Sequence, residues 1–138
     1  MYQRPHLFID GQWLAPQQGG QFEVYDPSDE SLLATVATAG PADVDLAVGA
    51  ARRAFDQGPW PRLSGVERAH TLRRIAEGIR ARQDELAVLE VRDNGKPLPE
   101  AQWDIADAAG CFDFYADLAE RLDTDERPVA LADARFRA

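Results

Sequence analysis

Cys111 is the only cysteine of the 138-residue chain and therefore its only candidate thiol nucleophile. A reactive cysteine needs a pKa lowered by a nearby cation or by the N-terminus of a helix. Cys111 instead lies in the middle of a helical pattern, with the acidic residues Asp107 and Asp113 nearby. We interpret it as a small buried hydrophobic residue and not as a catalytic thiol. A single cysteine forms no internal disulfide, which fits a reducing compartment.

Acidic side chains are the most plentiful charged groups in the C-terminal third of the chain. Asp113, Asp117 and Glu120 are spaced as neighbours on one helix face, and like charges at this spacing indicate exposure to solvent. His6 and His70 are the only histidines. Two scattered histidines and one cysteine do not predict a zinc site. The sequence also lacks the glycine-rich, phosphate-loop and G-x-S-x-G motifs that bind nucleotides or carry a nucleophilic serine.

The composition limits the kinds of partner. The chain has a net charge of −9, with 45% hydrophobic and 28% charged residues, as in an ordinary globular domain. Its densest basic run, residues 68–82, is interrupted by Glu77 and indicates a solvated helix face, not a surface for nucleic acid. No segment has the pattern of a signal peptide or a membrane span. We therefore expect a cytoplasmic protein with neither nucleic acid nor a membrane as a partner.

The elements that would position these side chains begin with short strands. Asp10-Gly11 suits a two-residue hairpin turn, and Phe22 and Val24 alternate with polar residues as in a half-buried strand. We expect a small antiparallel meander, preceded by a frayed terminus that includes His6. A sheet of this size is rarely stable without a layer packed on it. The predicted strands are residues 7–9, 12–14, 21–25 and 32–37.

The remaining elements are predicted helices. Pro41 suits a first helical position, and Ser64 and Glu67 have the spacing of a capping box. A change of phase near residues 83–85 predicts a break, and Gly95 followed by Pro97 ends the next helix. The last helix runs from about residue 99 to 122. The faces that we expect to be buried carry Val44, Ala47, Val48, Ala51 and Phe55, then Leu72, Ile75, Ala76 and Ile79, and finally Ala108, Cys111, Tyr115, Leu118, Ala119 and Leu122.

The order of elements, strands first and helices afterwards, favours an α+β arrangement if the chain is complete. A final strand begins at residues 129–131 without a partner. Three amphipathic helices against so small a sheet indicate instead that part of the fold is missing.

Read with its flanks, Asn94-Gly95-Lys96-Pro97 resembles the Asn/Thr-Gly-Lys-Pro turn of the NAD(P)-dependent aldehyde dehydrogenases. Other segments resemble the same family in the same order. They are residues 6–13 (first hairpin), 22–27 (strand and turn), 43–60 (first helix and loop), 73–76 and 84–87 (next helical pieces) and 112–122 (last helix). Because the resemblance covers essentially all 138 residues, the chain is identified as a member of this family, and specifically as an N-terminal segment.

The resemblance implies an α/β fold, in which this chain is the N-terminal part of the nucleotide-binding domain: antiparallel strands followed by helices, and incomplete. Residues 1–123 would belong to that domain, and residues 124–138 would start a truncated oligomerisation arm whose strand pairs across subunits. The implied assembly is a homo-oligomer, either a dimer or a tetramer. As an exposed edge, the strand at residues 129–131 favours aggregation of the isolated chain.

The resemblance also implies an activity that this chain does not carry alone. Members oxidise an aldehyde to a carboxylic acid with NAD or NADP, through a cysteine thiohemiacetal, hydride transfer and hydrolysis of a thioester. The family's nucleophilic cysteine, base glutamate and NAD-binding residues lie beyond position 138. No catalytic or cofactor-binding residue is therefore assigned here, we expect no cofactor on the chain alone, and Cys111 does not occupy the position of the family's nucleophile.

Lesser site residues do map onto this chain by resemblance. Asp93, with a backbone carbonyl of Val24 or Tyr25, resembles a sodium or potassium site of some members, and the alternative is that Asp93 stabilises the turn. Trp103 and Asp107 fall where members line the aldehyde entrance tunnel. Without the family, Trp103 is either a packing anchor or a pocket wall, and we favour the packing anchor. An acid at position 107 would disfavour a long aliphatic substrate. Asp117 stands where the family usually has glycine, and its side chain is expected to hinder close helix packing there.

Three hypotheses follow from the sequence. The first is a fragment of an aldehyde dehydrogenase, inactive by itself and part of an enzyme only in a longer polypeptide. The second is a non-catalytic partner or structural subunit of a dehydrogenase complex. The third is an unrelated α+β interaction module.

Overall fold

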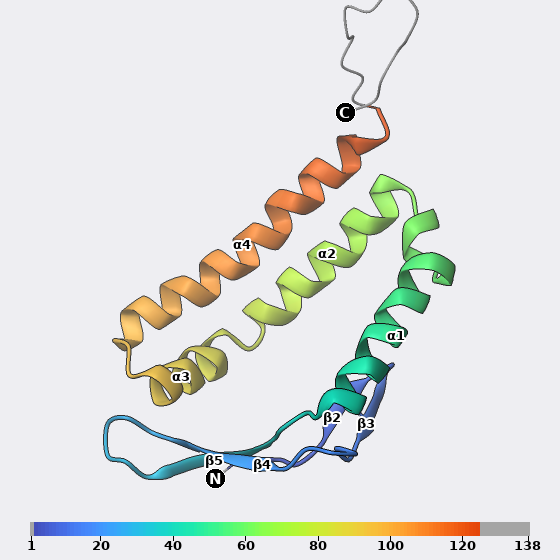
Figure 1. Cartoon of the computed structure of the whole chain (residues 1–138). Helices are drawn as coiled ribbons and strands as arrows, with labels where there is room; N and C mark the ends of the chain where they lie inside the picture. Colours follow the sequence, from blue (N-terminus) through green and yellow to red (C-terminus); the bar gives the residue numbers. More distant parts are fainter. Residues whose placement is uncertain (1, 125–138) are drawn as a thin grey trace, which may run out of the picture. The chain divides into compact units, whose positions relative to one another are not determined.

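The computed structural model describes residues 2–124, which form two compact units (Figure 1). The first, which we call the sheet unit, contains the described residues of Met1–Pro61 and Asp84–Asp104. The second, the helix-pair unit, contains those of Arg62–Gln83 and Ile105–Ala138. The strand predicted at residues 129–131 lies outside the described residues, as does the predicted oligomerisation arm beyond Thr124.

Five short strands form two separate sheets in the sheet unit. Three strands have the order β1-β5-β4, with β4 antiparallel and β1 parallel to β5, and β2 pairs with β3 as an antiparallel hairpin. The predicted strands are confirmed, but the single meander is wrong, and residues 2–4 are a strand instead of a frayed end. The partner of β1 lies about 30 residues away, which no local pattern reveals. The strands are β1 (Tyr2–Arg4), β2 (Leu7–Ile9), β3 (Gln12–Leu14), β4 (Gln21–Tyr25) and β5 (Leu32–Ala37).

The hairpin turn between β2 and β3 has the predicted two-residue form. Asp10 and Gly11 have φ angles of 53° and 76°, as both central residues of a type I′ turn require. The Asp10 carboxylate also pairs with Arg53 at 3.0 Å. The rings of Phe8 and Trp13 lie 5.0 Å apart across the hairpin. The turn chemistry and the aromatic pair together fix the register of this small sheet.

The helices also begin and end close to the predicted positions. Ser64 and Glu67 form the capping box, and the predicted break separates two helices. Gly95, immediately after the second of these, has a φ of 80°. The helical elements are α1 (Pro41–Gln57), the 3-10 turn η1 (Trp60–Arg62), α2 (Gly65–Arg80), α3 (Gln83–Asn94) and α4 (Leu98–Leu122).

The start of α1 is fixed by a buried carboxylate. Asp43 is 2% exposed, and its two oxygens accept hydrogen bonds from the backbone N–H groups of Gln17 (2.8 Å) and Gly40 (2.9 Å). These backbone donors hold the pKa of Asp43 below its usual value. Asp43 therefore remains ionised at neutral pH and ties the loop before β4 to the first turn of the helix.

The buried face of α1 is not the predicted one. Val44, Val48 and Phe55 are 50%, 62% and 66% exposed. The covered side carries Ala50, beside a groove of about 290 Å³ between β2 and the alanines of the helix. Apolar residues occupy more than one face of α1, and the three-residue strand β2 covers only the alanine side. Periodicity alone does not distinguish these adjacent faces.

Small residues mediate the packing in the helix-pair unit, where α2 and α4 run side by side in opposite directions (Figure 1). Ala69 and Ala76 of α2 are fully buried. A Cβ on Gly65, which lies on the same face of α2, would come within 2.0 Å of the Ala119 carbonyl oxygen. The Gly65 N–H donates a hydrogen bond to the Asp123 carboxylate at 2.6 Å. The two backbones therefore approach more closely than larger side chains would permit.

The predicted buried face of α4 is also wrong. Cys111 is exposed, and Tyr115 and Leu122 are 60% and 47% exposed. The fully buried positions on this helix are instead alanines, Ala101, Ala109 and Ala116. Apolar side chains occur on several faces of α4, so the positions of the largest ones did not identify the face that packs. Our interpretation of Cys111 as a buried hydrophobic residue fails for the same reason.

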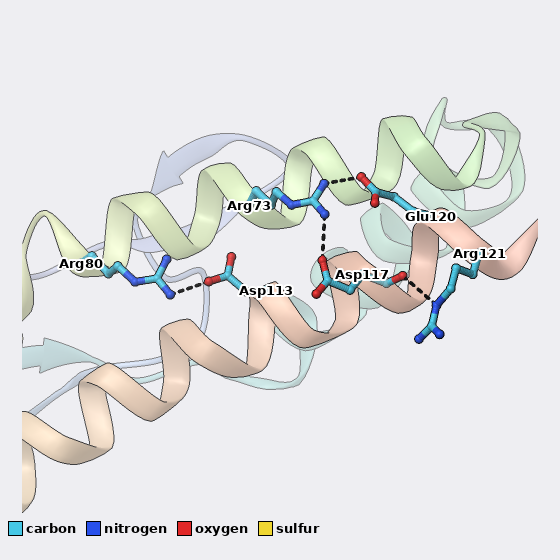
Figure 2. Close-up of polar contacts among 6 residues, drawn as sticks. All are labelled: Arg73, Arg80, Asp113, Asp117, Glu120 and Arg121. Carbon is cyan, nitrogen blue, oxygen red and sulfur yellow. Dashed lines mark hydrogen bonds and ion pairs between the residues drawn. The ribbon is translucent and has the colours of Figure 1, made fainter.

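The acidic face of α4 makes ion pairs with α2, as Figure 2 shows. Arg73 bridges Asp117 (2.8 Å) and Glu120, and Arg80 pairs with Asp113. The hydrogen bonds that Arg73 donates, first to Glu120 and then to Asp117, raise the pKa of Arg73, and the same contact lowers the pKa of Glu120. The side chain of Asp117 is 68% exposed, so the acid at the family's glycine position does not obstruct the helix contact.

Candidate functional site

The turn between α3 and α4 is a tightly packed part of the sheet unit. The Gly95 N–H donates to the Val91 carbonyl at 2.8 Å, and the Lys96 N–H donates to Asn94 Oδ1 at 2.9 Å. A Cβ on Gly95 would lie 3.1 Å from Cγ of Pro27. With a positive φ as well, this position requires glycine. The turn is thereby held against the loop that follows β4.

Asp26, at the end of β4, forms the polar centre of that loop. It is 4% exposed and accepts hydrogen bonds from Ser28 N (3.0 Å), Ser28 Oγ (2.6 Å) and Arg92 Nε (2.9 Å). The bonds from Ser28 and then Arg92 hold the pKa of Asp26 below its usual value. Sequence reasoning found only a turn here, although Asp-Pro-Ser is a familiar Asx-turn signal. Asp26 thus ties the end of β4 to the last turn of α3.

The lowered pKa of Asp26 predicts a loss of stability in acid. A carboxyl whose folded pKa lies below its unfolded value of about 3.9 stabilises the fold fully above that pH. The contribution is lost as the pH falls through the lower folded pKa. We expect Asp26→Asn to reduce the midpoint of thermal unfolding at pH 7 and to differ much less from the wild type in strong acid. Asp45→Asn, on the exposed side of α1, is the control, and an equal deficit for Asp26→Asn at both pH values would contradict this prediction.

Asp93 lies on α3, and Val24 and Tyr25 lie on β4. The contact between Asp26 and Arg92 joins these two segments. Asp93 is exposed in the last turn of α3, and a β-bulge lies between Val24 and Tyr25 of β4. A bulge leaves backbone groups out of the strand ladder, so a carbonyl there is suited to a hard cation, as is a carboxylate. In residues 2–124 no three histidine, cysteine or acidic residues gather as a metal cluster. The donor set fits a weakly held monovalent ion and not a transition metal.

The side chain of Tyr25 is engaged elsewhere. Its hydroxyl donates to the Glu23 carboxylate, and this hydrogen bond raises the pKa of Tyr25. If Tyr25 contributes to the expected cation site, it would therefore do so through its backbone carbonyl.

Lys96 connects α3 to α4 through a cluster that sequence reasoning missed. Its Nζ lies 2.9 Å from Glu90 Oε1 and also pairs with Asp104. Hydrogen bonds to Asp104 and then Glu90 raise the pKa of Lys96. The sequence analysis identified Lys96 only as part of the turn after a helix, because its two partners come from different helices.

Trp103 and Asp107 lie one turn apart on α4. Trp103 is 73% exposed, which contradicts the interpretation as a packing anchor within the described part of the chain. Asp107 is also exposed, and no cation pairs with it among residues 2–124. Cys111 follows one turn later in mid-helix, so it lacks the helix N-terminus that would activate a thiol. An exposed indole and an exposed carboxylate are each chemically suited to contact a cation.

The sequence profile of the aldehyde dehydrogenase family matches residues 13–137. A chloroplastic aminoaldehyde dehydrogenase of Arabidopsis thaliana is 44% identical over 136 residues, which cover 96% of this chain and 27% of that protein. The chain therefore spans about a quarter of the length of the curated relatives that it matches. No helix in residues 2–124 is long and apolar enough to span a membrane.

Solved structures give the same result for the fold. An NAD-dependent aldehyde dehydrogenase from Sinorhizobium meliloti superposes with a TM-score of 0.82 at 34% identity, over 91% of this chain and 24% of that one. A betaine aldehyde dehydrogenase from Staphylococcus aureus, solved with NAD+, superposes with a TM-score of 0.83 at 30% identity, over 96% of this chain and 26% of that one. The predicted arrangement of strands followed by helices is that of the N-terminal part of these structures.

Proposed function

The chain belongs to the aldehyde dehydrogenase family, and we propose that it is the N-terminal segment of an enzyme that oxidises an aldehyde to a carboxylic acid with NAD+. The observation that carries this proposal is that the family profile matches residues 13–137, while the chain covers only about a quarter of the length of its relatives. NAD+ bound in a solved relative supports the cofactor, and NADP+ is the alternative. When bound, the nicotinamide accepts the hydride from the substrate.

In this proposal the chain itself contributes positioning, not covalent catalysis. No residue of the chain is assigned as the nucleophile, base or nucleotide ligand. Asp93 and a carbonyl of Val24 or Tyr25 would hold a sodium or potassium ion, supported by the bulge and by the Asp26–Arg92 contact. Residues 1–123 would belong to the nucleotide-binding domain and residues 124–138 to an oligomerisation arm. The assembly would be a cytoplasmic homo-oligomer.

We propose further that the substrate is an aldehyde bearing a positively charged nitrogen. Relatives are named aminoaldehyde and betaine aldehyde dehydrogenases. On this chain, exposed Trp103 offers a π face and Asp107 a carboxylate one turn away on α4. Both groups attract a cation, and Asp107 would disfavour a long aliphatic chain. Together they would form part of the substrate tunnel.

The experiment is to read the gene past codon 138, express the whole open reading frame and measure NADH formation with amino and neutral aldehydes. We expect Asp107→Asn to raise the KM for an aminoaldehyde by about tenfold, since one charge partner is removed, and to change the KM for a neutral aldehyde much less. Asp45→Asn makes the same charge change on α1 and is the control. Equal effects on both aldehydes would contradict the tunnel assignment.

The second candidate function is a non-catalytic partner of a dehydrogenase. It requires a stop codon after Ala138 and a stable complex with a separate dehydrogenase subunit. Affinity purification of the chain from its source cell without any dehydrogenase would rule it out.

A further inference from the structure

We draw no further inference here: the strongest candidate, the apolar groove between β2 and α1 that Phe8, Ile9 and the alanines of α1 line within the sheet unit, carries nothing, because nothing in the structure shows what covers it.

Discussion

Expressed alone, the 138-residue chain is expected to self-associate and to elute from a sizing column as a broad, high-mass species. The reason is the poor burial of its large apolar side chains. In residues 4–124 the buried hydrophobic residues are Leu33 and seven alanines. By contrast, many large apolar residues are at least half exposed, including Phe8, Trp13, Phe22, Val48, Phe55, Trp103, Phe114 and Tyr115. Apolar surface of this extent is normally covered by another part of a protein.

Light scattering coupled to the sizing column measures this prediction. We expect Val48→Lys with Phe55→Lys to reduce self-association, because both side chains lie on the exposed face of α1. A pair of lysines at the polar positions Asp45 and Gln57, which raises the net charge by one unit more, is the control. Deletion of residues 124–138 should reduce association further if those residues form an intersubunit strand. A compact monomer with cooperative unfolding would contradict the prediction.

Replacement of Gly65 by alanine is expected to destabilise the fold by about 3 kcal/mol, at the upper end of the usual effect of overpacking. The added Cβ would lie 2.0 Å from the Ala119 carbonyl oxygen, and backbone atoms cannot rotate away as the end of a side chain can. α2 would have to move away from α4. The displacement would also weaken the bond from the Gly65 N–H to Asp123.

Gly78 provides a matched control in the same helix. A Cβ there meets nothing within 4 Å, so Gly78→Ala should stabilise α2 by up to about 1 kcal/mol through helix propensity. The midpoint of thermal unfolding of the longer polypeptide should therefore fall for Gly65→Ala and rise slightly for Gly78→Ala. Similar midpoints for the two variants would refute the close approach of α2 and α4.

Local chemistry accounts for the features that the sequence predicted well. Asp10-Gly11, the Ser64–Glu67 box and Gly95 each specify a backbone conformation within a few residues, and all three have the predicted form. The parallel pairing of β1 with β5 was missed because it depends on contact between distant segments. The same holds for the bond between Asp26 and Arg92, which are 66 residues apart.

The buried faces of α1 and α4 were predicted wrongly for a physical reason. We chose the faces with the largest apolar residues, such as Phe55 on α1 and Tyr115 on α4. The described part of the chain instead packs through alanine, which permits close backbone contact at the cost of little buried area. Large apolar side chains identify a helix face that a protein surface covers. They do not show whether that surface belongs to the described part of the chain. Asp93, Trp103 and Asp107 came only from the family resemblance, since nothing in their local pattern distinguishes them from ordinary surface residues.

The packing of α2 on α4 has a consequence for how their alignment is specified. Alanines set the distance between two helices, but a row of equal methyl groups gives nearly the same contact after a slide of one turn. The alignment then depends on the fit of Gly65 against Ala119 and Asp123, and on the ion pairs of Arg73 and Arg80 with the acidic residues of α4. These ion pairs help to hold the two helices at one position along their axes, and dissolved salt weakens them. High ionic strength should therefore loosen the alignment of these helices before it separates them.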